Sequence, residues 1–402
     1  MEPISSLRIA LVSPLISKNA TGLSSYIAAL VPRLCDAGHQ VTVIASDCGY
    51  RGAEAGELVA IDPRAELKLF TVCGPLDRRL YRCPELKHWM QQSVQQFDVV
   101  DVQVIWSCIA VDAARACVAA GVPFVLTPHG MMTRWDWSKQ MTLKRIFFAT
   151  QLGPVWRRAH AIRYLSQGEL DSSVVMPPGR YTIIPNAMEL PSSLNCPATA
   201  RFARERLGLS DDAQLVLFLG RVTPQKGVIE LLQAFERIAV ACPRSILAIA
   251  GPLDGEYGEQ VRQRAASMAY GDRVRVLGPV FGGVKSDLFA AASVFVTLSK
   301  NEGLSIAALE ALSFGVPAVL TRASNLPEVE LGGGGVITGG DPAVAANALI
   351  GLLRNPSRLE QMRGKARRIV ERNFSWQAVM PKLSQLYFEV AATRAAAAAR
   401  SN

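Results

Sequence analysis

Several classes of protein are excluded by what this sequence lacks. Only four of its 402 residues are histidine, and its eight cysteines are scattered without a Cys-x-x-Cys pair. Few histidines leave few ligands for a zinc site, and scattered thiols in a chain of this size are typical of a reducing compartment. We therefore expect a cytoplasmic protein without a zinc site.

Long apolar runs are also missing. The nearest candidate, 289–298, has ten residues and is interrupted by Ser293 and Thr297, whereas a membrane-spanning helix needs about 18–20 apolar residues. Near the N-terminus, Glu2 precedes a short apolar run over 7–12, and no basic segment comes before it. This pattern argues against a signal peptide and favours a first β-strand.

The chain carries a net charge of +9. No known nucleic-acid-binding motif appears in the sequence, so we expect no nucleic-acid partner. An anionic membrane surface is the other explanation for the excess charge. Segment 134–163 combines seven cations and one acid with five large aromatic residues. Its cations are Arg134, Lys139, Lys144, Arg145, Arg157, Arg158 and Arg163, and its aromatic residues are Trp135, Trp137, Phe147, Phe148 and Trp156.

Two interpretations of segment 134–163 stay open from sequence. Cations mixed with large aromatic residues are typical of a helix that lies in a membrane interface. The alternative is a solvated helix whose aromatic residues face the core. In the first case the protein is cytoplasmic with peripheral contact to the inner face of the membrane.

The hydrophobic pattern predicts an α/β fold with two domains. A chain this long exceeds one ordinary core, and apolar β-branched runs alternate with helical segments, which favours doubly wound parallel sheets. The expected strands are 8–13, 40–45, 97–105, 123–127, 215–219, 245–250, 274–277, 294–298 and 318–321, and the expected helices are 24–37, 227–241 and 306–314. Linker composition over 186–200 divides two Rossmann-like domains, 1–190 and 191–375, which are followed by a C-terminal helix and Ala-rich tail over 376–402. In such sheets, ligands bind at the carboxyl ends of the strands, here in a cleft between the domains.

Two cations follow the predicted strand 215–219. Gly220 ends this strand, Arg221 comes next, and Lys226 stands just before the following helix. A guanidinium fork and a point charge together suit a diphosphate. Two surface cations on a turn are the alternative interpretation.

Two carboxylates, Glu302 and Glu310, flank the start of the predicted helix 306–314. The free N–H groups of a helix start suit phosphate oxygens. Glu310 lies roughly 7–8 Å further along the helix axis, where a carboxylate can accept the hydroxyls of a ribose. It could instead be a solvated helix residue, but its alanine and leucine neighbours make an unpartnered carboxylate costly, which favours binding.

Further motifs accompany this pair along nearly the whole chain. They are Thr21-Gly22, Thr127-Pro128-His129-Gly130-Met131 with Trp135, Ile184-Pro185-Asn186-Ala187, Leu277-Gly278-Pro279-Val280, Phe314-Gly315-Val316-Pro317 and Phe374-Ser375-Trp376. In this order and spacing, the sequence resembles the retaining glycosyltransferases of family 4, also called group 1, which have the GT-B fold.

The resemblance implies transfer of a hexose-type sugar from a nucleotide-diphosphate sugar to an acceptor hydroxyl. Arg221 and Lys226 would bind the diphosphate, Glu310 the ribose and Glu302 the sugar, while His129 would reach the sugar from the first domain. His129 as a simple loop cap is the alternative. The predicted catalytic residues are thus Arg221, Lys226, His129 and Glu302, and the predicted donor-binding residues are Gly22, Gly220, Val280, Gly303, Leu304, Ser305 and Glu310.

In this family, retention is usually explained by front-face attack, with the leaving phosphate helping to deprotonate the acceptor. The sequence has no Asp-x-Asp triplet, so we expect no metal and no cofactor, with the two cations neutralising the diphosphate. Relatives often carry histidines where Asp101 and Gln103 stand, and glycine where Thr21 stands. These departures lie on the expected acceptor side, in the first domain.

We expect a glycan or lipid-linked saccharide as acceptor, in exopolysaccharide, lipopolysaccharide or lipid-linked glycan synthesis. A GT-B epimerase or phosphorylase, and a non-catalytic subunit that binds a nucleotide sugar, are the alternatives. Those other enzymes lack the two spaced glutamates in this context. Loss of Arg221, Lys226, Glu302 or Glu310 would have indicated a non-catalytic subunit, but all four are present.

Overall fold

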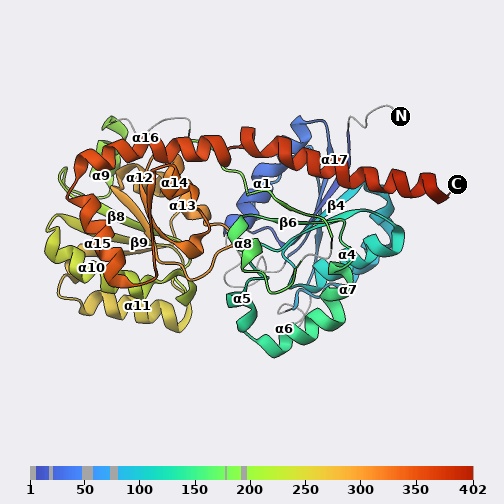
Figure 1. Ribbon diagram of the computed structural model, residues 1–402, viewed down its shortest axis with the longest axis horizontal. Helices are drawn as coiled ribbons and strands as arrows, with labels where there is room; N and C mark the ends of the chain where they lie inside the picture. The colour runs from blue at the N-terminus through green and yellow to red at the C-terminus, as the bar shows by residue number, and fades with distance from the viewer. Residues whose placement is uncertain are drawn as a thin grey trace. The chain divides into compact units, whose positions relative to one another are not determined.

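A computed structural model describes residues 6–17, 21–47, 58–72, 80–176, 179–191 and 197–401 (Figure 1). The predicted linker therefore lies in part, over 192–196, outside the described residues. The chain forms two compact units. Unit 1 contains Met1–Asn186 and Val379–Asn402, and unit 2 contains Ala187–Ala378.

Unit 1 is built on a parallel sheet of seven strands in the order β3-β2-β1-β4-β5-β6-β7. Its central strands β4 and β5 are buried on both faces, as expected for a sheet covered by helices on both sides. The strands are β1 (Arg8–Leu15), β2 (Gln40–Ser46), β3 (Glu66–Phe70), β4 (Val99–Gln103), β5 (Phe124–Thr127), β6 (Ala161–Tyr164) and β7 (Tyr181–Ile183).

The helices of unit 1 follow these strands. Helix α4 shows local control of its ends, because the Ser107 side chain accepts from the N–H of Ala110 and Gly121 closes the helix with a φ of 65°. The other helices are α1 (Thr21–Asp36), α3 (Pro84–Ser93), α5 (Arg134–Ser138), α6 (Met141–Phe147), the π-helix η3 (Phe148–Leu152), α7 (Gly153–Trp156) and α8 (Gln167–Asp171), with α4 over Cys108–Ala120. A 3₁₀ turn, η2 (Val94–Gln96), follows α3.

Unit 2 repeats the design with six parallel strands in the order β10-β9-β8-β11-β12-β13. They are β8 (Gln214–Leu219), β9 (Ser245–Ala250), β10 (Val274–Gly278), β11 (Val294–Thr297), β12 (Ala318–Thr321) and β13 (Gly335–Thr338). The helices are α9 (Pro197–Arg206), α10 (Val228–Ala241), α11 (Gly255–Ser267), α12 (Gly282–Ala291), α13 (Ile306–Ser313), α14 (Glu328–Leu331), α15 (Pro342–Leu353) and α16 (Pro356–Asn373). The 3₁₀ turns are η4 (Pro224–Lys226), η5 (Gly271–Arg273) and η6 (Arg322–Ser324).

Strand order fixes where a ligand can bind in each sheet. The order reverses beside the first strand of each unit, between β1 and β4 and between β8 and β11. The loops that follow such a pair of strands diverge to opposite faces of the sheet, which opens a crevice at their carboxyl ends. Unit 2 therefore offers a binding position after β8 and β11.

The predicted fold class is confirmed, since both sheets are parallel and alternate with helices. Each predicted strand is present, although 97–105 shortens to β4 and 294–298 shortens to β11. The hydrophobic pattern did not predict β3, β6, β7 and β13. No helix in the described part of the chain is long and apolar enough to cross a membrane.

The C-terminal helix α17 (Trp376–Ser401) belongs to unit 1 from Val379 onward (Figure 1). Its Tyr387 is fully buried and donates a 2.6 Å hydrogen bond to Oδ2 of Asp101 in β4. Thr127 donates to the other carboxylate oxygen over 3.3 Å, and burial raises the pKa of Asp101. Asp101, a departure from the family pattern, thus joins the returning helix to the sheet.

We predict that Tyr387→Phe lowers the free energy of unfolding by about 1–3 kcal/mol, because a buried carboxylate oxygen loses its donor. Tyr181→Phe is the matched control, since Tyr181 is 49% exposed and surface changes usually stay within about 0.5 kcal/mol. Denaturant unfolding of the two variants measures the difference. Equal stabilities would contradict a stabilising role for this hydrogen bond.

Candidate functional site

The loop after β8 places a lysine at the switch point of the unit 2 sheet. Lys226 ends the turn η4, and Gly227 follows with a φ of 67°. A Cβ on Gly227 would lie 2.2 Å from the carbonyl oxygen of Leu298, just beyond β11. Glycine is thus required for both its conformation and its close approach, and it holds Lys226 against the neighbouring strand end.

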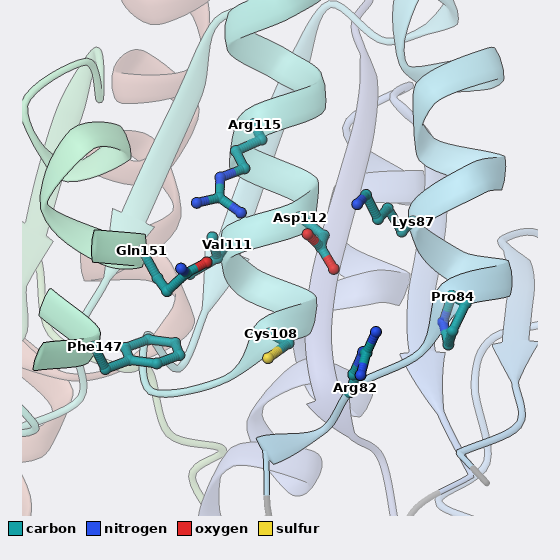
Figure 2. Close-up of a pocket in the computed structure, with 9 residues that line it drawn as sticks. All are labelled: Arg82, Pro84, Lys87, Cys108, Val111, Asp112, Arg115, Phe147 and Gln151. Carbon is teal, nitrogen blue, oxygen red and sulfur yellow. The ribbon is translucent and has the colours of Figure 1, made fainter. Parts of the chain in front are cut away.

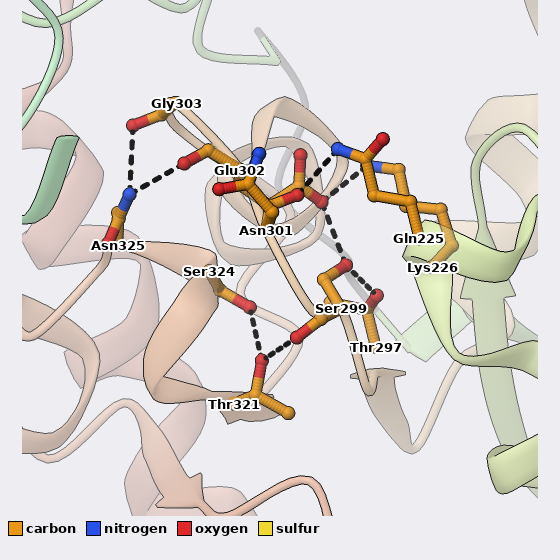
Figure 3. Close-up of polar contacts among 10 residues, drawn as sticks. All are labelled: Gln225, Lys226, Thr297, Ser299, Asn301, Glu302, Gly303, Thr321, Ser324 and Asn325. Carbon is orange, nitrogen blue, oxygen red and sulfur yellow. Dashed lines mark hydrogen bonds and ion pairs between the residues drawn. The ribbon is translucent and has the colours of Figure 1, made fainter. Parts of the chain in front are cut away.

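The loop after β11 supplies the partner of Lys226. Glu302 is 8% exposed, and its Oε1 accepts from Nζ of Lys226 and, over 2.8 Å, from Oγ of Ser299 (Figure 3). Thr297 and Ser299 share a further 2.8 Å hydrogen bond. Oε2 of Glu302 makes no hydrogen bond within the described part of the chain. One oxygen therefore orients the carboxylate, and the other is left to accept from a ligand.

Three more polar side chains hold the loop that carries Glu302 (Figure 3). Asn325, with a φ of 57°, donates to the carbonyl oxygens of Glu302 over 2.6 Å and of Gly303 over 3.4 Å. Gln225 donates to the carbonyl of Asn301 over 2.6 Å. Thr321 donates to the carbonyl of Ser299 over 2.5 Å. Sequence reasoning missed these residues, although polar residues just beyond strand ends were a usable signal.

Helix α13 begins immediately after this loop. Its N-cap, Ser305, makes no side-chain bond to the first helical N–H groups. The N–H of Ser305 itself donates to the carbonyl of Ser324 over 3.3 Å. The first N–H groups of a helix have no intrahelical acceptor, and the dipole makes this end positive. The N-terminal end of α13 can therefore bind an anion.

Glu310 lies in α13 and is half-buried. Its Oε1 accepts a 2.5 Å hydrogen bond from Nζ of Lys285 in α12. The expected cost of a carboxylate in this apolar helix is thus offset by a lysine that sequence reasoning did not single out. Because a carboxylate has several acceptor positions, this ion pair leaves room for hydroxyl groups.

The remaining predicted residues of unit 2 differ in their surroundings. Arg221 is exposed, and it forms no ion pair with any residue that the structure describes. Gly220, Gly303 and Val280 are half-buried, and Val280 follows the edge strand β10. Leu304 and Ser305 are buried at the start of α13. Of the predicted set, the structure brings Lys226 and Glu302 into direct contact.

His129 and Gly22 belong to unit 1. His129 follows β5 with a φ of 53°, and its Nε2 lies 2.6 Å from Oε1 of Gln103 at the end of β4. Burial, helped by the charge of Arg163, lowers the pKa of His129 to about 3, so its imidazole is neutral at pH 7. Gly22 lies in the first turn of α1, and residues 18–20 before it lie outside the described residues.

Family models match most of the chain. Residues 21–187 match the glycosyl transferase 4-like domain, and residues 200–369 match glycosyl transferases group 1. The chain belongs to the group 1 glycosyltransferases. The family resemblance seen in the sequence is therefore confirmed.

Curated relatives of this group 1 glycosyltransferase match in part of their length. The D-inositol 3-phosphate glycosyltransferase of Geodermatophilus obscurus is 33% identical over 233 residues, 56% of this chain and 50% of that protein. That of Thermobispora bispora is 30% identical over 283 residues, 67% of this chain and 65% of that protein. The chain thus spans about half to two thirds of the length of these relatives.

Solved structures show the same fold at lower identity. Sucrose-phosphate synthase from Thermosynechococcus elongatus has a TM-score of 0.77 at 20% identity, with 96% of this chain and 100% of that chain covered. Anabaena Alr3699/HepE in complex with UDP and glucose has a TM-score of 0.74 at 18% identity, with 94% and 99% covered. The predicted GT-B fold is confirmed.

We predict that Gly227→Ala destabilises the protein more than Gly255→Ala. Both glycines have nearly the same φ, 67° and 69°, but an added Cβ meets nothing within 4 Å at Gly255. Gly255→Ala should therefore cost about 1–2 kcal/mol from backbone conformation alone, whereas Gly227→Ala also separates the two strand ends. Thermal unfolding of both variants tests this, and equal losses would show that the contact with Leu298 is unimportant.

Proposed function

We propose that this chain transfers a hexose from a nucleoside diphosphate sugar to an acceptor hydroxyl. The observation that supports it most is the contact between Lys226 and Glu302 at the switch point of the unit 2 sheet. It sets a cation and an oriented carboxylate beside the open start of α13. A diphosphate needs positive charge, and a sugar needs fixed acceptors for its hydroxyls.

The diphosphate is assigned to Arg221, Lys226 and the start of α13. The ammonium of Lys226 has three N–H donors, so it can keep Glu302 and still bind a phosphate oxygen. Arg221, five residues earlier in the sequence, is exposed, and its guanidinium fork is available for a second phosphate. These positive groups stabilise the charge that grows on the leaving group, and the proposal includes no metal and no cofactor.

The sugar and the ribose are assigned to the two glutamates. Oε2 of Glu302 faces no protein donor among the described residues, so we assign it to hydroxyls of the transferred sugar. Glu310, held by Lys285, is assigned to the ribose hydroxyls. Val280 is assigned to the neighbourhood of the base. His129 is neutral and is assigned to hydrogen bonding with the sugar rather than to charge.

Retention of configuration is part of the proposal. In a front-face reaction, the leaving phosphate helps to deprotonate the acceptor, so no protein nucleophile is needed. Family resemblance supports this course. The inositol phosphate named in the curated relatives and the UDP and glucose named with Alr3699/HepE suggest the first donors and acceptors to test here. A glycan or a lipid-linked saccharide stays the proposed acceptor class.

We also propose peripheral contact with an anionic membrane surface, through α6. Four of the five aromatic residues of segment 134–163 do not carry it, since Trp156 is buried and Trp137, Phe147 and Phe148 pack with Trp106 against the unit 1 core. Two of the seven cations of the segment cannot contact a membrane surface freely either, because Arg163 is fully buried and Lys144 is paired with Asp136. What α6 exposes instead is aliphatic: Met141, Leu143 and Ile146, at 43%, 65% and 57% exposure. Arg145 is exposed on the same helix.

We predict that one or more nucleoside diphosphate sugars raise the thermal midpoint, as a ligand specific to the native state must. Glu310→Gln should weaken that binding about tenfold, the effect of losing a charged hydrogen bond. Glu330→Gln, at an exposed glutamate of α14, is the control.

Donor turnover separates the alternatives. Release of nucleoside diphosphate by the native protein but not by Lys226→Met supports sugar transfer. Donor binding without any turnover would indicate a non-catalytic subunit, and an epimerised or phosphorylated sugar would indicate another GT-B enzyme. A complete absence of donor binding would reject the proposal.

We predict that Leu143→Gln with Ile146→Gln abolishes most binding to phosphatidylglycerol vesicles, because each exposed aliphatic side chain contributes buried apolar area. Leu331→Gln, at a leucine of α14 that is 86% exposed, is the matched control. Co-sedimentation measures binding, which should weaken with salt and in Arg145→Gln. Binding that ignores salt and both α6 changes would exclude this surface.

A further inference from the structure

A cavity of about 250 Å³ lies among the helices of unit 1, and none of its lining residues is assigned to the donor (Figure 2). Helices α3 and α4 form two of its sides, and the end of α6 with the following π-helix forms the third. Its lining residues are Arg82, Pro84, Lys87, Cys108, Val111, Asp112, Arg115, Phe147 and Gln151. All belong to unit 1, whereas the residues assigned to the diphosphate belong to unit 2.

Three cations reach this cavity from three different places in the sequence. Arg82 precedes α3, Lys87 lies in α3 and Arg115 lies in α4 (Figure 2). Arg82 and Lys87 form no ion pair with any described residue, and Arg115 has one long contact, 3.5 Å, to the carbonyl of Thr150. Like charges gathered around one space repel each other. An anion in the cavity would relieve that repulsion.

One carboxylate, Asp112, stands among the three cations. It is half-buried in α4, and no described cation lies close enough to form an ion pair with it. Burial raises its pKa, while Lys87, Arg115 and Arg82 act in the opposite direction. A single carboxylate leaves two of the three positive charges uncompensated. It also gives the cavity an acceptor for a hydroxyl group.

The cavity has an apolar side as well. Val111 and Phe147 line it, so a ligand with carbon atoms beyond its charged group is better matched than a bare ion. A volume near 250 Å³ is at the small end of ligand pockets, which range over about 300–1,000 Å³. It therefore suits a phosphate group with a short hydroxylated substituent.

We propose that this cavity binds a phosphate ester. The phosphate oxygens accept from Arg82, Lys87 and Arg115, a hydroxyl group of the substituent donates to Asp112, and its carbon atoms contact Val111 and Phe147. Guanidinium and ammonium groups are the usual partners of phosphate. This proposal does not depend on sugar transfer, because its residues take no part in the assigned donor site.

The ester has two sources, a lipid headgroup or a soluble phosphate. Phe147 lies one helical turn after Leu143 on α6, and side chains at this spacing share a helix face. The cavity thus adjoins the exposed aliphatic part of α6, which favours a headgroup whose acyl chains stay in the membrane. A soluble sugar phosphate or polyol phosphate has the same chemistry without the chains.

The test is a calorimetric titration of the whole protein with glycerol 3-phosphate. Lys87→Gln with Arg115→Gln should weaken binding about tenfold or more, since two charged hydrogen bonds are lost. Lys382→Gln with Arg237→Gln is the matched control, because both residues are exposed and lie on helices α17 and α10. Asp112→Asn should tighten binding several-fold, because it removes a repulsive charge while the amide oxygen can still accept from the hydroxyl group; mere structural damage does not tighten binding.

A second arm separates the two sources. Vesicles containing phosphatidic acid are compared with vesicles of phosphatidylcholine alone, with glycerol 3-phosphate as competitor. If glycerol 3-phosphate displaces the protein from phosphatidic acid vesicles, and this displacement is lost in the Lys87→Gln, Arg115→Gln protein, the ligand is a lipid headgroup. If glycerol 3-phosphate binds but does not displace the protein from vesicles, the ligand is a soluble ester. Equal weakening by the control pair, or no effect of any cavity substitution on either ligand, would overturn the proposal.

Discussion

The candidate site depends on one ion pair, between Lys226 and Glu302, that joins the ends of two neighbouring parallel strands. The two loops also contact each other directly, since the side chain of Gln225 in the β8 loop donates to the carbonyl of Asn301 in the β11 loop. Gly227 lets the β8 loop touch the backbone at Leu298, and Ser299 orients Glu302 at the end of β11. Loops after a switch point would otherwise diverge. The ion pair therefore holds the loops after β8 and β11 in place at the crevice before a ligand binds.

In unit 1, buried charged residues hold together segments that are distant in the sequence. Asp101 holds Tyr387 of the returning helix, and Arg163 donates to the carbonyls of Ile184 and Pro185 at the end of the unit. Arg163 also donates to Oδ1 of Asn186. A buried polar group that lost its partner would be costly. These contacts thus make the path of the chain into and out of unit 1 specific.

Much of the fold follows from sequence because the buried central strands are mostly apolar, as in β8 and β11. The missed strands have weaker signals. β3 consists of exposed and half-buried residues at the sheet edge, and β7 has three residues. The donor-side motifs were readable because their chemistry is local: charged groups directly follow strand ends. Lys285 and the inward packing of Phe147 were not readable, since both depend on contacts distant in sequence.

The two glutamates of the site differ in how ready they are for a ligand. Glu302 is 8% exposed and fixed by Lys226, Ser299 and the Asn325 contacts to its backbone. Glu310 is more open and has a single described partner, the long side chain of Lys285. Fixing a group in advance lowers the entropy cost of binding. Preorganisation is thus greatest where the proposed reaction needs a defined sugar orientation, and less at the proposed ribose position, where a lysine can rearrange.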